Sequence, residues 1–442
     1  MSGTEPSVRI TGGRPLRGTV TVQGGKNIAL HLYAVGALAD EPLTLTGAPE
    51  ILDTGVCAEI LRRTGARTTV RAGEFTVRPA GHPHPVIPAG PGRRIRTTAV
   101  LGAALLARAG WVGFPMPGGD AFCVRLIDRH LAAMTAAGCE VEVARGRVRA
   151  RFGPGRRRPF AVDAATRRWG PSLGATVTAM LLAARAPGTS VIRNPSREPE
   201  VICAAALLEQ SGVGVEWGDG ELRVTGTGYV RGGVFAVPPD RLEAATLALA
   251  AAVTGGSVRL AGFPVSAFPA GLVAVFAAAG IHLSDGDGDD TVGGDAAGAG
   301  GGTEVRAPAG LRAVRLATGP HPGFPTDVQP QLTAALARAE GTSRIEERIY
   351  RRRDSHLPAL IAFGASVGAA GPVITVRGPS RLTAADVVGQ DIRAVSALVI
   401  AALAAHGTST VRGLYHLRRG HGHLLPKLAS LGAELTIEGD VT

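Results

Sequence analysis

The sequence predicts an α/β protein of two domains, assembled from six copies of one repeat unit. The first observation is a glycine turn that recurs roughly every 70 residues, each time after an apolar helical stretch. These turns are Thr64-Gly65-Ala66, Ala137-Gly138-Cys139, Ser211-Gly212-Val213, Ala279-Gly280-Ile281, Phe363-Gly364-Ala365 and Leu431-Gly432-Ala433. The second observation is a strand-opening turn, found at Gly188-Thr189-Ser190, Gly255-Gly256-Ser257, Gly341-Thr342-Ser343 and Gly407-Thr408-Ser409. Because turns match at both ends of a unit, chance similarity in an Ala/Gly-rich chain explains them poorly.

The elements follow one order along the chain. Residues 8–13 and 16–22 have the pattern of two short strands joined by a turn. Gly24 to Asn27 then opens an Ala/Leu-rich helix that runs to Leu38. Lys26 at such a helix start can meet an anion, although an exposed lysine on a capped helix is an equal alternative. In later units an apolar helix leads to a strand, a charged loop, a second helix and further strands.

Composition sets the architecture of the core. The chain has 442 residues, enough for two domains with their own cores. Hydrophobic residues make up 45% but aromatics only 4%, so small aliphatic side chains must fill the interior. Paired strands and helices cannot bury their faces alone, and six units therefore predict two domains of three units. We expect Ala-rich helices inside each domain and sheets outside.

The predicted domain boundaries divide the chain unequally. Residues 23–235 form the first domain, and residues 1–22 and 236–442 form the second. The N-terminal strands precede the first unit, so they can pair with the later domain, and the chain would then cross twice. The Gly/Asp-rich stretch 284–303 is predicted to be a flexible insertion within the fourth unit.

Charge and cysteine content narrow the class of partner. The net charge of +11 favours acidic small molecules or nucleic acid. Scattered arginines and few aromatics argue against nucleic acid. The four cysteines have neither C-x-x-C nor zinc spacing, so no disulfide framework and no metal site are expected. No apolar signal region and no uninterrupted span of about 20 apolar residues occurs. We expect a soluble cytoplasmic protein without membrane contact.

One loop carries an acid next to a cation. The turn Pro117-Gly118-Gly119 presents Asp120, and Arg125 follows five positions later. Asp128 and His130 lie at the start of the helix that comes next. Taken alone, this stretch is more typical of a solvated turn than of a site. Similar charged loops recur in the other units, however, at Arg96, at Arg197 to Glu200, at Asp327, at Tyr350 to Arg353 and at Asp391 to Arg393. Several cations with isolated carboxylates suit a polyanionic substrate and acid–base chemistry.

These motifs, in this order, resemble the UDP-N-acetylglucosamine 1-carboxyvinyltransferases over nearly the whole chain. The matching stretches are 24–27, 117–120, 172–176, 197–200, 239–243, 324–327, 391–393, 415–416 and 419–420. The shikimate-pathway enolpyruvyl transferases share the fold but are less similar. The resemblance implies an inside-out α/β barrel fold of two lobes that close on substrate, with charged loops converging on the cleft. It implies transfer of the enolpyruvyl group of phosphoenolpyruvate to a sugar hydroxyl, with release of phosphate, in peptidoglycan precursor synthesis. No metal or other cofactor is implied.

The resemblance also implies roles for individual residues. Catalytic roles fall to Lys26, Asp120, Asp327 and Asp391. The phosphoenolpyruvate contacts are Lys26, Arg96, Arg125, Arg353, Arg393 and Arg419. The acceptor contacts are Asn27, Leu126, Ile127, Asp128, Arg129, Ser172, Leu173, Gly174, Asp327, Ile349 and Arg351. By resemblance Asp327 is the base for the acceptor hydroxyl, and Asp391 lies near the transferred methylene carbon. Asp120 stands where many members of the family carry a cysteine, so a carboxyl group would deliver the proton here. The antibiotic fosfomycin alkylates that cysteine. We therefore expect fosfomycin to be ineffective against this protein.

Four departures from the family pattern concern the acceptor. Residues 125–129 read Arg-Leu-Ile-Asp-Arg where the family usually has Arg-Pro-Val-Asp-Leu, and Gly170 stands where the family usually has a lysine. Residues 351–353 replace the usual Glu-Asn-Arg, and residues 418–423 replace the usual Asp-Arg-Gly-Tyr-Glu-Arg. They favour a rival acceptor, UMP or a related nucleotide, as used by enolpyruvyl transferases of nucleoside-antibiotic pathways. An alternative of another class is a basic nucleic-acid-binding protein, whose affinity would fall steeply with salt. The oligomeric state stays open, with a monomer as one option.

Overall fold

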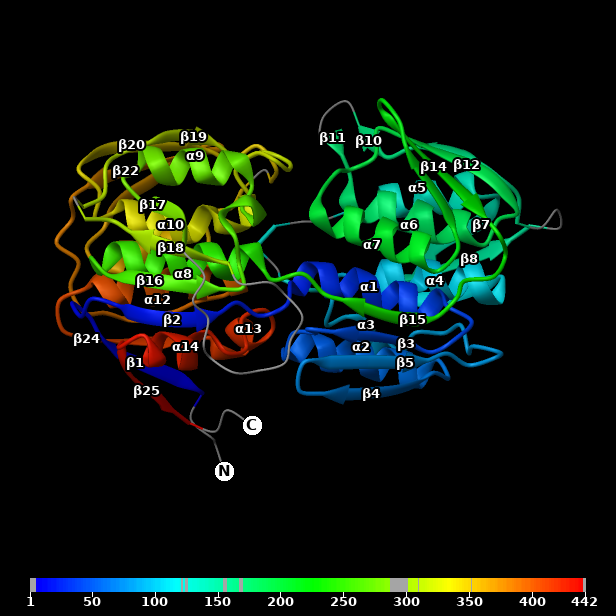
Figure 1. Ribbon diagram of the computed structural model, residues 1–442, viewed down its shortest axis with the longest axis horizontal. Helices are drawn as coiled ribbons and strands as arrows, with labels where there is room; N and C mark the ends of the chain where they lie inside the picture. The colour runs from blue at the N-terminus through cyan, green and yellow to red at the C-terminus, as the bar shows by residue number, and fades with distance from the viewer. Residues whose placement is uncertain are drawn as a thin grey trace. The chain divides into compact units, whose positions relative to one another are not determined.

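A computed structural model of the protein describes residues 5–120, 122–123, 126–153, 157–166, 170–286, 301–308, 310–350 and 352–439. The chain divides into two compact domains (Figure 1). The first domain comprises residues 24–119 and 124–238. The second comprises residues 1–23, 120–123 and 239–442, so the tip of the Asp120 loop groups with the second domain. None of the helices described is long and apolar enough to cross a lipid bilayer.

The first domain alternates helices and strands. Its helices are α1 (Lys26–Leu38), α2 (Leu52–Arg63), α3 (Ala89–Gly92), α4 (Thr98–Ala109), α5 (Asp128–Ala136), α6 (Leu173–Ala184) and α7 (Pro199–Gln210). Its strands are β3 (Leu43–Thr46), β4 (Arg67–Arg71), β5 (Glu74–Arg78), β6 (Trp111–Pro115), β7 (Cys139–Ala144), β8 (Arg147–Phe152), β9 (Ala161–Asp163), β10 (Ala165–Thr166), β11 (Gly170–Pro171), β12 (Gly188–Arg193), β13 (Gly214–Trp217), β14 (Glu221–Gly226) and β15 (Gly233–Ala236).

The second domain has the same alternation. Its helices are α8 (Arg241–Val253), α9 (Ala270–Ala278), α10 (Gln329–Leu336), α11 (Leu357–Ala362), α12 (Ile392–Ala404), α13 (Leu414–Arg418) and α14 (Leu424–Ser430), with 3₁₀ turns η1 (Val265–Ala267) and η2 (Thr326–Val328). Its strands are β1 (Ser7–Thr11), β2 (Arg17–Thr21), β16 (Ser257–Ala261), β17 (His282–Gly286), β18 (Gly302–Arg306), β19 (Arg315–Ala317), β20 (Gly341–Glu346), β21 (Ser366–Ala370), β22 (Val373–Gly378), β23 (Asp386–Val388), β24 (Thr408–Arg412) and β25 (Glu434–Glu438).

Sheet topology confirms the predicted α/β class and its repeat. Five sheets have one parallel edge strand followed by antiparallel neighbours, in the orders β15-β3-β5-β4, β9-β12-β14-β13, β2-β16-β18-β17, β19-β20-β22-β21 and β23-β24-β1-β25. The three-stranded sheet β6-β8-β7 has a parallel bridge from Val86 to Gly113 at the corresponding edge, and β10 and β11 form a separate two-stranded sheet. Among the described residues the sheets stay separate and none closes into a barrel. The most deeply buried helices are α1, α4 and α6 in the first domain and α8, α10 and α12 in the second.

Two edge strands belong to one domain but lead directly into a helix of the other. Strand β2 leads directly into α1 but pairs with β16, and β15 leads into α8 but pairs with β3. Strand β1 likewise completes a sheet with β24 and β25, from the far end of the chain. The N-terminal strands are therefore part of the second domain.

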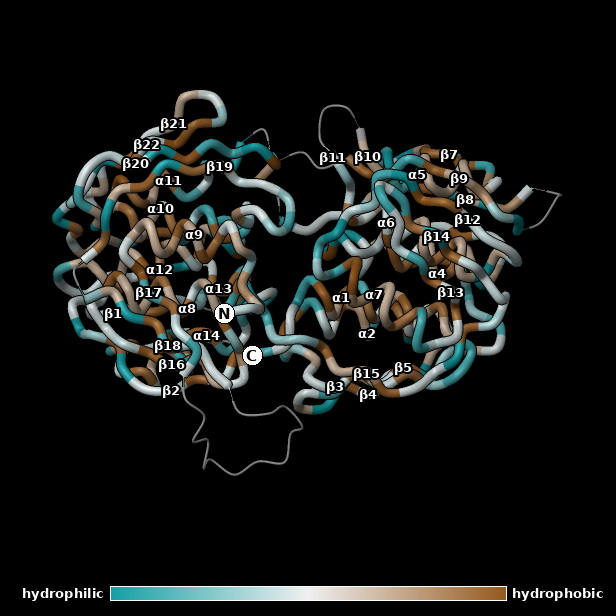
Figure 2. The backbone as a smooth tube through the Cα atoms, turned by 45° about the horizontal axis from the view of Figure 1, so that its top comes forward, coloured by the Kyte–Doolittle hydropathy of each residue, from teal (hydrophilic) through white to brown (hydrophobic). Residues whose placement is uncertain are grey.

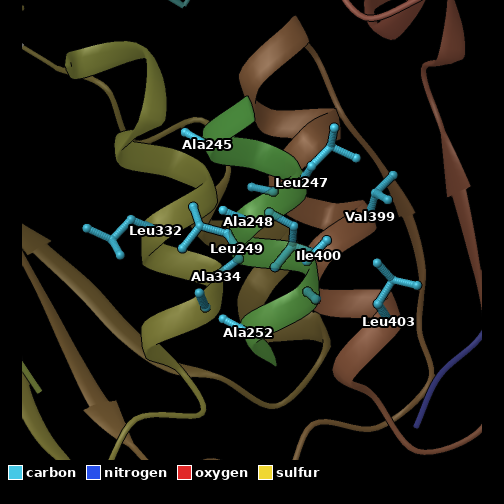
Figure 3. Packing of buried hydrophobic residues seen from close by; sticks show 14 of the residues in the cluster. Ala245, Leu247, Ala248, Leu249, Ala252, Leu332, Ala334, Val399, Ile400 and Leu403 are labelled. Carbon is cyan, nitrogen blue, oxygen red and sulfur yellow. The ribbon is translucent and has the colours of Figure 1, made fainter. Parts of the chain in front are cut away.

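Small side chains let the inner helices approach closely. In the first domain α1 packs against α4 and α7, and α6 packs against α4 and α7. Hydrophobic residues line these helices, as the colouring of α1 and α7 in Figure 2 shows. In the second domain α8, α10 and α12 pack on one another, and Figure 3 shows alanines such as Ala248 and Ala334 between larger residues such as Leu332 and Ile400. Alternating small and large side chains fill the interior at close packing.

The predicted insertion at 284–303 is wrong at both ends. Ser284 and Asp285 belong to β17 and pair with Glu304 and Thr303 of β18. The two antiparallel strands are longer than their composition suggested. Cross-strand pairing holds residues that have low strand propensity by themselves. Residues 287–300 lie outside the described part of the chain.

Three strand ends touch helix ends so closely that only glycine fits. A Cβ at Gly226 would lie 2.2 Å from the carbonyl oxygen of Ala183 and 2.3 Å from that of Ala186, at the end of α6. Gly378 and Gly12 meet the ends of α10 and α12 in the same way. This repeated junction ties α6, α10 and α12 each to a neighbouring strand.

Replacing Gly226→Ala should destabilise the protein by about 1–3 kcal/mol, because backbone atoms must move to admit the methyl group. The matched control is Gly55→Ala in α2, where a Cβ would have nothing within 4 Å. It should be neutral or stabilising by up to about 1 kcal/mol, since alanine favours the helix. Urea unfolding of both variants measures this. Equal stability of the two would contradict the close junction.

Candidate functional site

The carboxylate of Asp327 lies between two arginines of the second domain. Asp327 is in η2, immediately before α10. Its Oδ1 is 2.8 Å from Nη1 of Arg353, and its Oδ2 accepts a hydrogen bond from Nη2 of Arg393 at 3.0 Å. Both arginine side chains are buried, 4% and 5% exposed, whereas 25% of the Asp327 side chain is exposed. The carboxylate thus compensates two buried cations and keeps an edge open to solvent.

This arrangement sets the protonation state of Asp327. Burial on its own would raise the pKa of its carboxyl group, but the charges of Arg393 and Arg353 outweigh burial and hold the pKa well below its ordinary value. Burial would lower the pKa of Arg353, whereas the charge of Asp327 raises it above its ordinary value. Asp327 is therefore an anion with little tendency to accept a proton.

A network behind Arg353 holds this side chain in place. Its Nη1 donates to Oγ1 of Thr326 at 3.0 Å, and Thr326 donates to Oε2 of Glu347 at 2.9 Å. Buried Glu347 also accepts from the backbone N–H of Ile349 and Tyr350, at 2.8 and 3.0 Å. This fixes the loop after β20, where Ile349 is half-buried. The predicted contact Arg351 lies outside the described residues.

Aromatic rings cover the Arg353 guanidinium. Its Cζ lies 4.5 Å from the ring centroid of Phe122 and 5.4 Å from that of Tyr350. The two rings meet edge to face, with centroids 5.0 Å apart. Contacts of this kind are attractive because the ring face is electron-rich. Phe122, two residues after Asp120, therefore helps to group the loop tip with the second domain.

Asp391 and Arg393 sit at the start of α12. Oδ1 of Asp391 accepts from the backbone N–H of Arg393 and Ala394, at 2.9 and 3.0 Å, so Asp391 is the N-cap of this helix. Its Oδ2 accepts from Oγ of Ser355 at 2.6 Å. Nη1 of Arg393 is 2.6 Å from Nε2 of His421. The N-cap fixes the backbone at Arg393, whose side chain contacts both Asp327 and His421.

Asp120 forms an ion pair with Arg419. Nη1 of Arg419 lies 2.6 Å from Oδ1 of Asp120, and the two side chains are only 6% and 15% exposed. The predicted acid and one predicted phosphoenolpyruvate contact are thus brought together within the second domain. Arg125, the cation predicted beside Asp120, lies outside the described residues.

In the first domain, Lys26 is buried and paired. Nζ of Lys26 lies 2.9 Å from Oδ2 of Asp53, with both side chains under a tenth exposed. The alternative of an exposed lysine on a capped helix is therefore wrong, because α1 starts at Lys26 within the domain interior. Elsewhere, Arg96 donates to the carbonyl of Leu126. The Leu126 side chain itself is 71% exposed.

Seven of the residues predicted to bind the acceptor, 126–129 and 172–174, lie at the starts of α5 and α6. Ser172 caps α6, accepting from the backbone N–H of Ala175 at 3.4 Å, and Leu173 and Gly174 form the first turn. A Cβ at Gly174 would lie 2.5 Å from Cε1 of His130, so the imidazole rests directly on the helix end. Nearby, α5 begins with exposed Asp128 after buried Ile127, and Arg129 donates to the carbonyl of Gly170 at 2.8 Å.

Two histidines beside these helix starts are neutral. Burial, followed by the charges of Arg96 and Arg129, lowers the pKa of His130 to about 3. Burial lowers the pKa of His31, whose Nδ1 contacts the carbonyl of Asn27 at 2.6 Å. Since a carbonyl only accepts, Nδ1 of His31 carries the proton. Sequence reasoning missed His31, although its place one turn after Asn27 was a signal.

Comparisons with known proteins identify the family. The model of the family described as EPSP synthase (3-phosphoshikimate 1-carboxyvinyltransferase) matches residues 10–428. The chain belongs to this family of enolpyruvyl transferases and is a transferase. This confirms the resemblance inferred from the sequence motifs.

Individual relatives are similar over nearly their full length. The UDP-N-acetylglucosamine 1-carboxyvinyltransferase of Zymomonas mobilis is 36% identical, over 97% of this chain and 98% of its own. The enzyme called UDP-N-acetylglucosamine 1-carboxyvinyltransferase 3 of Symbiobacterium thermophilum is 38% identical, over 98% of each chain. The enolpyruvyl transferase NikO of Streptomyces tendae has a TM-score of 0.87 at 27% identity, over 99% of this chain and 100% of its own. EPSP synthase of Acinetobacter baumannii shares the fold, with a TM-score of 0.75 over 98% of this chain and 100% of its own. Its sequence is 18% identical.

The variant Asp327→Asn should lose roughly 2–3 kcal/mol of stability at pH 7, because two buried cations lose their counter-charge. The folded-state pKa of Asp327 lies below the unfolded value of about 3.9, so its contribution is present above that pH and is lost as the pH falls. The stability gap between wild type and variant should be constant from about pH 8 to 5 and narrow below about pH 4. Urea unfolding across this range measures it. A gap that closes between pH 7 and 5 would show that Asp327 titrates near neutrality.

Proposed function

We propose that this enolpyruvyl transferase moves the carboxyvinyl group of phosphoenolpyruvate to a hydroxyl of UDP-N-acetylglucosamine, with release of phosphate, in peptidoglycan precursor synthesis. The observation that carries the proposal is the Asp327 carboxylate held between two buried arginines, in a chain of this family. The acceptor is supported by relatives of that name at 36–38% identity over nearly the whole chain.

The arginines suit the two anionic groups of phosphoenolpyruvate. Arg353, Arg393 and Arg419 are buried cations, and each already pairs with a carboxylate, Asp327 or Asp120. An incoming phosphate or carboxylate group would compete for the same guanidinium groups with two parallel hydrogen bonds. Substrate binding would then loosen Asp327 and Asp120 from their partners. Asp327 would gain proton affinity only once substrate is in place, because Arg393 and Arg353 hold the pKa of its carboxyl group well below the ordinary value.

The reaction needs one base and one acid. In the proposed sequence, Asp327 takes the proton of the acceptor hydroxyl as its oxygen bonds to C2 of phosphoenolpyruvate. Asp120, which must be protonated for this step, gives its proton to C3, so that the CH2 group becomes a methyl group. The Asp120 carboxylate then takes a proton back from this methyl group as phosphate leaves C2, which restores the double bond, and the proton held by Asp327 leaves with the phosphate. Asp391 is proposed to act near C3 from its place at the start of α12, where it also fixes the backbone of Arg393.

The first domain is proposed to supply further contacts. Lys26 would bind phosphoenolpyruvate together with Arg96. The acceptor would meet Asn27, residues 126–129 and the first turn of α6 at Ser172, Leu173 and Gly174. Free backbone N–H groups at a helix start favour a phosphate, and α6 has twelve residues.

UMP is the second candidate acceptor, and the Gly170 turn favours it. Gly170 replaces the family's usual lysine and has φ +62°, in the left-handed region that favours glycine. Its carbonyl is held by Arg129, so this turn carries a different cation from the family pattern. A cation relocated in this way suits a phosphate placed differently from that of the nucleotide sugar.

The decisive experiment incubates the protein with phosphoenolpyruvate and, separately, UDP-N-acetylglucosamine, UMP, UDP or shikimate 3-phosphate. Phosphate release and product mass are followed, with each substrate omitted in turn as control. We expect release with UDP-N-acetylglucosamine and a product heavier by one carboxyvinyl group. Because Asp120 offers no thiol, we also expect the rate to be unchanged by fosfomycin.

Other outcomes separate the alternatives. Release with UMP alone would replace the proposed acceptor by the second candidate. No release with any acceptor would contradict the enzyme activity. Salt-sensitive binding of nucleic acid that ignores phosphoenolpyruvate would then favour the basic binding protein.

A further inference from the structure

The turn after α13 carries a buried histidine that contacts the Asp327 cluster. His421 follows two residues after Arg419, and its side chain is 1% exposed. Its backbone N–H donates to the carbonyl of Leu417 at 2.7 Å. The carbonyl of Gly420 accepts from Nε2 of Gln23 at 2.8 Å. The imidazole is therefore held in one place by the backbone on which it stands.

The contact between His421 and Arg393 determines the state of the ring. Nη1 of Arg393 is 2.6 Å from Nε2 of His421. A guanidinium group has five N–H donors and no acceptor, so Nε2 must accept the hydrogen bond. Nδ1 then carries the only ring proton, and the imidazole is neutral. A doubly protonated ring could not accept and would place another cation beside Arg393.

Arg393 is thereby held at two of its nitrogens. Nη1 donates to His421, and Nη2 donates to Asp327. The Asp391 cap fixes the backbone of Arg393 but not the end of its side chain. Without an acceptor at position 421, one nitrogen of a buried guanidinium would lose its partner, and the group could turn away from Asp327.

We propose that His421 is a positioning residue for phosphoenolpyruvate binding: its neutral imidazole accepts a hydrogen bond from Arg393 and aims this arginine at the substrate anion. The inference rests on the proposed role of Arg393 toward phosphoenolpyruvate. It adds a residue at a position where the family pattern has a tyrosine. The side chain at position 421 must then place a hydrogen-bond acceptor next to Nη1 of Arg393. An apolar side chain that only fills the same space does not meet this requirement.

The test compares His421→Gln with His421→Met, two side chains of similar length of which only glutamine offers a good acceptor. His406→Met, at an exposed histidine, is the control. Calorimetry measures the Kd for phosphoenolpyruvate, steady-state kinetics separate kcat from the KM of each substrate, and thermal melting checks folding. We expect His421→Met to bind phosphoenolpyruvate roughly tenfold more weakly, the loss of one charge-assisted hydrogen bond, with an unchanged KM for the acceptor. His421→Gln should stay within about threefold of wild type.

Equal phosphoenolpyruvate affinity of the two folded variants would overturn the inference. A second measurement applies even if His421→Met does not fold. In wild-type protein labelled with ¹⁵N-histidine, the resonance that disappears in His421→Gln should show an unprotonated Nε2 and a protonated Nδ1. The opposite tautomer, or a doubly protonated ring at pH 7.5, would overturn the proposed contact. A wild type that shows this tautomer but binds no phosphoenolpyruvate would instead contradict the proposed function.

Discussion

The second domain depends on one compensated group of charges, the carboxylate of Asp327 between Arg353 and Arg393. Two guanidinium groups with about a twentieth of their surface exposed are costly unless a negative charge faces them. The three residues come from two neighbouring repeat units: Asp327, before α10, and Arg353, after β20, belong to the fifth, and Arg393, in the first turn of α12, belongs to the sixth. The fold must therefore bring distant loops together to compensate these charges. An anion that replaces the carboxylate can use the same preformed cations.

The repeat explains why an aspartate lies at position 327. Each inner helix of the second domain is preceded by an aspartate: Asp240 before α8, Asp327 before α10 and Asp391 before α12. Asp240 and Asp391 cap their helices through backbone N–H groups. Asp327 stands in the extra turn η2, and α10 has no side-chain cap. Lengthening the helix entry by this turn frees one of three equivalent carboxylates from capping, so that it can pair with arginines.

Much of the architecture could be predicted because it depends on local patterns. Glycine turns and Ala/Leu periodicity are properties of short stretches, and they led to the six units and the α/β class. The ends of the 284–303 stretch could not be predicted, since Ser284 and Asp285 are strand residues only through pairing with β18. Composition describes a segment alone, whereas a strand needs a partner.

The same difference between local patterns and contacts of distant residues applies to the candidate site. Motifs placed Asp327, Arg353 and Arg393 among the candidates, and the structure brings these three together. The partners Asp53 of Lys26 and His421 of Arg393 were not foreseen, because each lies 27 or 28 residues from the residue it contacts and has no motif of its own. The place of Asp391 at a helix start, by contrast, could be predicted, because an aspartate directly before an apolar helix is a favoured N-cap.

The most direct measurement compares Asp327→Asn with wild type for phosphoenolpyruvate affinity and for turnover with the accepted nucleotide. Asp354→Asn, which removes an acid that pairs with Arg352 on the same loop, is the control. If Asp327 both holds the two arginines and serves as the base, turnover should fall by about 10² or more. Phosphoenolpyruvate should bind as tightly as to wild type or more tightly, because the arginines have lost a competing carboxylate. Normal turnover, or an affinity weakened about tenfold, a loss of roughly 1.4 kcal/mol, would contradict this role for Asp327.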